Sequence, residues 1–121
     1  MRQLARATLL VQGAFYVVTG LWPVVNMAAF ELVTGPKTDD WLVRMVGLLA
    51  AAIGATLFTA VRRGRVTPEV RLLAIASALS FAAIDLTYAL GGRISAVYLL
   101  DAAAEFLFAG ILATAGRAAE D

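Results

Sequence analysis

The stretch from Ala7 to Phe30 contains 24 residues and no charged side chain. As an α-helix it would be about 36 Å long, and the hydrocarbon core of a bilayer is about 30 Å thick. A soluble domain of this size leaves a large share of its residues in contact with water, so it could not cover such a segment together with the rest of an apolar chain. We therefore expect a transmembrane helix here.

The composition extends this expectation to the whole chain. Hydrophobic residues make up 61% of the 121 residues and charged residues 16%, whereas soluble domains have about 45–50% and about 25%. The sequence predicts an all-α protein, a four-helix antiparallel transmembrane bundle that forms a single domain over residues 1–121. The expected spans are residues 4–29, 41–61, 68–90 and 94–115.

Local signals mark the ends of these spans. Thr67, Pro68 and Glu69 supply a capping residue, a first-turn proline and a first-turn acid, which together indicate the start of a helix. Residues 31–40 are expected to form a loop, because they contain Thr-Gly-Pro-Lys. Residues 91–93 are expected to form a tight turn between the last two spans.

The basic residues predict an orientation. One side of the expected bundle holds seven of them, Arg2, Arg6, Arg62, Arg63, Arg65, Arg71 and Arg117, and the other side holds three, Lys37, Arg44 and Arg93. Since cytoplasmic flanks carry an excess of Lys and Arg, we expect both termini on the cytoplasmic side. The predicted location is a membrane, crossed by several spans.

Two missing residue types narrow the chemistry. The chain has neither Cys nor His, so disulfides, thiol chemistry and the commonest transition-metal ligand are excluded. We expect no metal and no cofactor. The net charge of +1 and the lack of a basic stripe also indicate no nucleic-acid partner. Any site must be built from carboxylates, Arg, Tyr, Asn, hydroxyls and backbone.

Three acids lie well inside the expected spans: Asp85, Asp101 and Glu105. A charge at the bilayer centre costs at least about 2.5–3.5 kcal/mol, so such residues face the bundle interior or a cavity. Asp85 and Asp101 are predicted to lie at similar depth below the outer surface. Glu105 follows Asp101 by four residues and therefore shares its helix face.

Other polar side chains fall in the same outer layer, while the inner half of the bundle is nearly apolar. The residues predicted to form a binding site are Asn26, Arg44, Asp85, Tyr88, Tyr98, Asp101 and Glu105. In a structural interpretation, Arg44 pairs with one or two of Asp85, Asp101 and Glu31. Tyr and Asn side chains satisfy the remaining polar groups, and the network fixes how the helices pack. In a functional interpretation, the layer is an outward-facing cavity in which at least one acid has no fixed cation.

The functional interpretation predicts a membrane protein that binds a lipophilic or cationic small molecule, in an accessory or structural role. An alternative is an acid–base membrane enzyme of the isomerase or hydrolase type, with Asp85, Asp101 and Glu105 as candidate catalytic residues. A proton-coupled small transporter is another alternative. The expected partners are membrane lipids, the ligand and a second copy of the chain, because the small residues of the spans would serve packing within and between bundles.

One segment carries a resemblance to a known group. It reads Trp22-Pro23, Phe30-Glu31, Val33-Thr34-Gly35-Pro36-Lys37, Asp39 and Trp41-Leu42-Val43. This resembles small uncharacterised bacterial four-span inner-membrane proteins, and the wider architecture resembles DoxX-like proteins. The resemblance covers about a fifth of the chain. It implies a location in a bacterial inner (plasma) membrane and a four-span topology, but no activity and no catalytic residues.

Overall fold

The computed structural model describes all residues from 1 to 121 and contains helices only. The helices are α1 (Arg2–Val25), α2 (Met27–Thr34), α3 (Asp40–Arg62), α4 (Pro68–Leu90), α5 (Tyr98–Ala115) and the short 3-10 helix η1 (Gly116–Ala119). This confirms the predicted all-α class with four long helices.

Four helical segments are long and apolar enough to cross a membrane: α1, α3, α4, and α5 together with η1. Many large apolar side chains on their outer faces are exposed, among them Leu48, Leu72 and Leu107. A lipid environment would cover such a surface, whereas water would not. The chain therefore has the make-up of a multi-pass membrane protein.

The first helix ends earlier than the predicted span, and a short helix replaces part of the predicted loop. Helix α1 contains Pro23, which lacks an N–H to donate to the preceding turn, and ends at Val25. Asn26 then starts α2, because its side-chain oxygen accepts a hydrogen bond from the backbone N–H of Ala29 at 3.1 Å. The chain thereby turns at Asn26 instead of continuing straight.

The fourth span also begins later than predicted, at Tyr98 instead of Ile94. The backbone N–H groups of Arg93 and Ile94 both donate to the carbonyl of Tyr88, which folds the connection back on the end of α4. Gly92 has a φ of 75° in this turn, a conformation that favours glycine. The connection between α4 and α5 is thus seven residues long, from 91 to 97.

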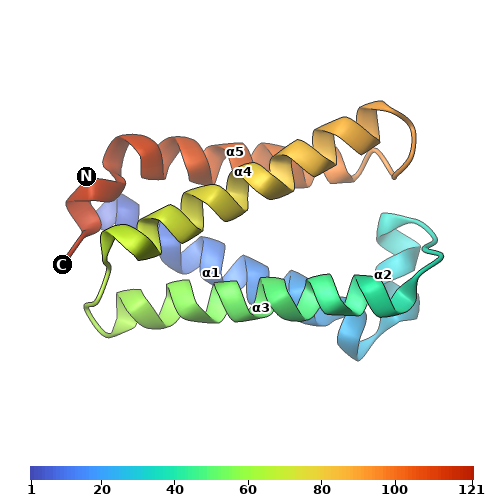
Figure 1. Cartoon of the computed structure of the whole chain (residues 1–121), viewed down its shortest axis with the longest axis horizontal. Helices are drawn as coiled ribbons and strands as arrows, with labels where there is room; N and C mark the ends of the chain where they lie inside the picture. Colours follow the sequence, from blue (N-terminus) through green and yellow to red (C-terminus); the bar gives the residue numbers. More distant parts are fainter.

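The helices form two pairs, in which α3 packs mainly on α1 and α4 mainly on α5, while α3 and α4 contact each other sparsely. Figure 1 shows that the pairs are close at the end that carries both chain termini, here called the Arg2 end. They diverge toward the end that carries α2 and the 91–97 connection, here called the α2 end.

Glycines allow the close contact between α1 and α3. A methyl group on Gly20 would collide with the carbonyl oxygen of Gly47, and one on Gly13 would lie 2.7 Å from the carbonyl oxygen of Gly54. Both glycines of each helix are seven residues apart, or about two turns. The earlier glycine of α1, Gly13, meets the later glycine of α3, Gly54, and Gly20 meets Gly47. Helices α1 and α3 therefore run in opposite directions. Gly47 and Gly54 are thus packing residues, as their small size predicted.

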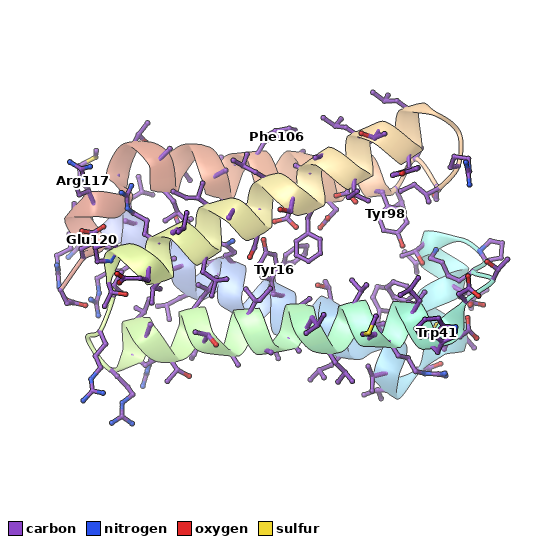
Figure 2. The ribbon with its side chains drawn as sticks, in the orientation of Figure 1. Tyr16, Trp41, Tyr98, Phe106, Arg117 and Glu120 are labelled. Carbon is purple, nitrogen blue, oxygen red and sulfur yellow. The ribbon has the colours of Figure 1, made fainter.

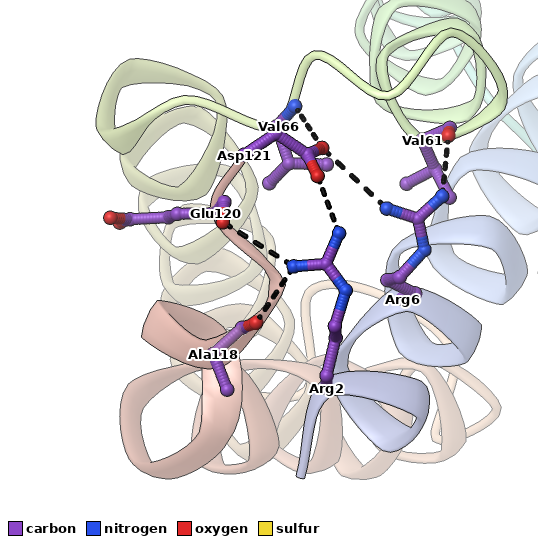
Figure 3. Close-up of polar contacts among 7 residues, drawn as sticks. All are labelled: Arg2, Arg6, Val61, Val66, Ala118, Glu120 and Asp121. Carbon is purple, nitrogen blue, oxygen red and sulfur yellow. Dashed lines mark hydrogen bonds and ion pairs between the residues drawn. The ribbon is translucent and has the colours of Figure 1, made fainter.

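The Arg2 end is closed by an apolar core and a polar cluster. The core includes the fully buried Leu9, Leu57 and Leu112. Arg2 forms an ion pair with Asp121 at 2.5 Å, and the Asp121 carboxylate also accepts the backbone N–H of Val66 at 3.0 Å (Figure 3).

These contacts fix the charge of Asp121. The Val66 N–H, together with the Arg2 guanidinium, holds the pKa of the Asp121 carboxyl below its usual range. Arg6 adds an ion pair at 3.5 Å and donates to the carbonyl of Val61 at 2.9 Å. The Arg2–Asp121 cluster therefore joins the first helix, the α3–α4 connection and the last residues of the chain.

Candidate functional site

A cavity of about 480 Å³ lies between the two helix pairs in the half of the molecule near the α2 end. Each long helix contributes to its wall, and α2 and the two connections at this end contribute one residue each. The lining is mostly apolar: Phe15, Gly20, Pro23, Phe30, Leu42, Val43, Val46, Gly47, Ala50, Phe81, Ile84 and Ile94, with Tyr16, Thr19, Lys37, Asp85, Tyr98, Asp101 and Glu105 as the polar residues.

The three acids predicted from the sequence all line this cavity. Asp85 comes from α4, with 5% of its surface exposed, and Glu105 comes from α5, with 1% exposed. Asp101 lies one turn before Glu105 on the same face of α5. Its carboxyl is close enough to both of the others to interact with them. The predicted i, i+4 arrangement on α5 thus faces the cavity.

Asp85 has an unused hydrogen-bonding atom. Its Oδ2 atom is buried and has no hydrogen-bond partner, and Asp85 forms no ion pair, because the ion pairs of the chain involve only Arg2, Arg6 and Arg71. A buried carboxylate oxygen without a partner costs free energy. Two carboxylates side by side in an apolar span also repel each other unless a proton or a cation lies between them.

Glu105 differs, because it has a fixed partner. The hydroxyl of Tyr16 donates to Glu105 Oε1 at 2.5 Å, and Gln12 Nε2 donates to the Tyr16 oxygen at 3.1 Å and to the carbonyl of Ala74 at 2.9 Å. Figure 2 shows the Tyr16 ring between the two helix pairs. This buried chain of hydrogen bonds forms the floor of the cavity and separates it from the apolar core at the Arg2 end.

Lys37 is the single basic residue in the cavity wall. Its ammonium donates to the carbonyl of Thr34 at 3.0 Å and to that of Gly35 at 2.9 Å. It also lies 5.7 Å from the centre of the Phe30 ring and 5.2 Å from that of Tyr98. Figure 2 shows the Tyr98 side chain extending from α5 toward α2. Lys37 therefore bridges the two sides of the cavity at the α2 end.

A second pair of carboxyls lies at the α2 end, with Glu31 on α2 and Asp40 at the first residue of α3. Glu31 and Asp40 each keep one buried oxygen without a hydrogen-bond partner. The neighbouring carboxyl of Asp40 raises the pKa of Glu31 above its usual range. Neither residue of this pair lines the cavity. The two residues flank the connection between α2 and α3, which carries Lys37.

Three residues of the predicted site lie elsewhere. Asn26 is exposed and caps α2, and Arg44 and Tyr88 are exposed on the outer faces of α3 and α4. None of the three lines the cavity. Arg44 forms no ion pair, so the structural interpretation in which it neutralises the acids was wrong. The sequence indicates the depth of these residues along their helices, but the side toward which they point depends on how the helices pack.

The structure also adds site residues that sequence reasoning missed. Tyr16 is fully enclosed in the bundle, with 2% of its surface exposed, and Phe30 lies against Lys37 at the α2 end. The signal for Tyr16 was present: Gln12 and Tyr16 are the polar residues one turn apart in the middle of an otherwise apolar span. Tyr98, the aromatic partner of Lys37 across the cavity, lies 61 positions further along the chain and left no local signal.

No protein-family model, no curated protein and no solved structure matches this chain. The function has to be argued from the cavity itself.

Proposed function

We propose that this protein binds an amphipathic small molecule with a positively charged head in the cavity between its helix pairs, in an accessory or structural role. The observation that carries the proposal is the Oδ2 atom of Asp85, which is buried in the wall and has no partner. A ligand cation would supply the missing partner at the place where the protein has already met the cost of burying the carboxyl.

Charge and shape favour an organic cation. The cavity wall contains three acids, Asp85, Asp101 and Glu105, and a single basic residue, Lys37. The Lys37 ammonium donates its hydrogen bonds to oxygens of its own loop. No group of three or more acids is close enough to hold a metal ion. The remaining wall is mostly aliphatic and aromatic, which suits the apolar tail of a lipophilic molecule. Helices α3 and α4 contact each other sparsely, and the tail would leave the cavity between them.

The proposed setting is a bacterial inner membrane, with both termini in the cytoplasm and the cavity toward the outside. The distribution of basic residues supports it, since Arg62, Arg63, Arg65 and Arg117 lie with the Arg2 end. The resemblance to DoxX-like proteins belongs to the same proposal. The proposed partners are membrane lipids and the bound cation.

An acid–base enzyme acting on a lipophilic substrate is the second candidate, because carboxyls from two helices and a tyrosine meet in one cavity. In that case Asp85 would exchange a proton with the substrate and Glu105 would be oriented by Tyr16. Recovery of the bound molecule chemically unchanged supports binding, and its conversion supports the enzyme. The packed core around Leu9, Leu57 and Leu112 argues against a transport path through one bundle.

The test is a titration with dodecyltrimethylammonium in dodecylmaltoside micelles, which carry no competing cation. Trp22 is the reporter, because its ring packs edge-on against that of Phe30 at 5.4 Å, and Trp41→Phe removes the other tryptophan. We expect saturable binding that Asp85→Asn weakens about tenfold or more, because the cation loses a buried charged partner.

The matched control is Asp39→Asn, which removes an exposed acid at the same end of the molecule. It should leave the affinity unchanged. Equal affinities for the parent protein and Asp85→Asn, or no saturable binding at all, would contradict the proposed function.

A further inference from the structure

The side chain of Lys37 occupies a place that resembles a binding site for an ammonium ion. Its nitrogen makes hydrogen bonds to the Thr34 carbonyl, the Thr34 hydroxyl at 3.2 Å and the Gly35 carbonyl. These three acceptors match the three protons of a lysine ammonium. The lysine is thus fully satisfied by its own loop and needs no carboxylate.

Two aromatic rings complete the place. Phe30 lies on α2 and Tyr98 on the first turn of α5, and both ring centres are within about 6 Å of the Lys37 nitrogen, the range of cation–π attraction. The two rings belong to helices that are not consecutive in the chain, because α3 and α4 lie between α2 and α5 in the sequence. A positive charge between them therefore holds α2 against α5 across the α2 end of the cavity.

Lys37 does not pair with the acids that share the cavity with it. The cavity contains three carboxyls, one of them with an unpartnered oxygen, yet the single basic residue in its wall forms no ion pair with any of them. The protein's own cation lies against the aromatic pair, and Asp85 Oδ2 is left without a partner. An arriving cation would meet both an attractive acidic interior and a like charge at Lys37.

We propose that Phe30 and Tyr98 form the subsite for a methylated ammonium head, and that Lys37 occupies this subsite until a ligand displaces it. The inference rests on the proposed function and names its ligand class. A methylated ammonium has no or few N–H donors and is bound through the faces of aromatic rings. It would use Phe30 and Tyr98 without needing the loop oxygens that Lys37 uses.

The experiment compares Lys37→Gln with its parent in the Trp41→Phe background, using the same dodecyltrimethylammonium titration. Removing the competing ammonium should tighten binding about tenfold, which is the effect of one cation–π site. The affinity for dodecanol, a neutral molecule with the same tail, should change less than about twofold, since it has no charge to place on the rings.

Three further variants control for trivial effects. Arg93→Gln removes a positive charge from the neighbouring 91–97 connection and should not tighten binding, because Arg93 is exposed and lies outside the cavity wall. Lys37→Arg keeps the competing cation and should not tighten it either. Tyr98→Leu should weaken binding of the ammonium about tenfold, whereas Tyr88→Leu, on the exposed face of α4, should not.

The outcomes separate this inference from the proposed function. If Lys37→Gln leaves the ammonium affinity unchanged, or tightens dodecanol equally, the subsite inference is overturned even where Asp85→Asn still weakens binding. If Asp85→Asn has no effect, the proposed function itself fails. Thermal unfolding of each variant in the same micelles identifies loss of the fold. If Lys37→Gln does not fold, the comparison of Tyr98→Leu with Tyr88→Leu decides, and equal ammonium affinities of these two variants overturn the subsite inference.

Discussion

The hydroxyl of Tyr16 donates a hydrogen bond to Oε1 of Glu105 at 2.5 Å, and this bond joins α1 to α5 halfway along the bundle. The Glu105 carboxyl that accepts it is almost completely buried. The apolar core lies between this bond and the Arg2 end, and the cavity lies between it and the α2 end. One tyrosine thus allows a carboxyl to remain inside a membrane span and marks the floor of the candidate site.

Removing that hydroxyl should destabilise the protein. In Tyr16→Phe the Glu105 carboxyl loses its donor and Gln12 loses an acceptor, and an unsatisfied buried polar group costs about 1–3 kcal/mol. We expect the free energy of unfolding, measured by SDS titration in maltoside micelles, to fall by about this amount. Tyr88→Phe, which changes an exposed tyrosine, should leave it unchanged; equal effects of the two variants would show that the buried bond is unimportant.

The glycine contact between α1 and α3 gives a second prediction. Gly20→Ala places a methyl group against the Gly47 carbonyl, which is backbone and cannot rotate away. The helices must separate, and we expect a loss of about 1–3 kcal/mol in unfolding free energy, as in other overpacked interiors.

Gly110→Ala is the matched control, because nothing lies within 4 Å of the added methyl group. It should be neutral or stabilise α5 by up to about 1 kcal/mol, since alanine favours the helix over glycine. A Gly20→Ala protein as stable as the Gly110→Ala protein would contradict the close packing described for α1 and α3.

The pair formed by Glu31 and Asp40 predicts a dependence on pH. The folded-state pKa of Glu31 is raised by Asp40, so its contribution to stability is present below the unfolded pKa and is lost as pH rises through the folded pKa. At neutral pH, Glu31→Gln should slow the hydrogen exchange of α2 amides relative to the parent. At about pH 4, near the usual glutamate pKa, the difference should vanish.

Glu69→Gln serves as the control, since Glu69 is exposed and lies at the Arg2 end. It should not slow exchange in α2 at any pH. Faster exchange in Glu31→Gln at neutral pH would mean that the two carboxyls do not repel each other.

The Asp121 carboxyl predicts a dependence of stability on pH with the opposite sign. Its folded-state pKa is lowered, first by the Val66 N–H and then by Arg2, so its contribution is present above the unfolded pKa and is lost as pH falls through the folded pKa. At neutral pH, Asp121→Ala should speed hydrogen exchange of the Val66 amide, which loses its acceptor. In strong acid the parent and the variant should converge, whereas Asp39→Ala should match the parent throughout.

The sequence predicted the part of this fold that depends on local patterns. Long apolar segments specified the four helices, and Thr67 and Pro68 marked the start of α4 at the observed residue. The spacing of Asp101 and Glu105 predicted their shared face, because four residues complete about one helical turn. Each of these features can be read from neighbouring residues without knowing how the helices pack.

The remaining features depend on how each helix is rotated about its own axis and on contacts between residues far apart in the sequence. Arg44 was placed at the right end of its helix, but the glycine contact of α3 with α1 turns it outward, and no local pattern fixed that rotation. Asn26 was expected at a site and instead caps α2. The contact between Lys37 and Tyr98 joins residues 61 positions apart, and such a contact follows only from the completed bundle.

The most direct test of the account is to locate the bound cation. A crystal structure of the protein with a bromine-labelled alkyltrimethylammonium would reveal the heavy atom by its anomalous signal. With bromine on a methyl carbon of the head group, we predict a peak inside the cavity, between Asp85 and the Tyr98 ring, that is weaker in Asp85→Asn. Peaks confined to the outer, lipid-facing surfaces of the helices, or a cavity peak equally strong in Asp85→Asn, would contradict it.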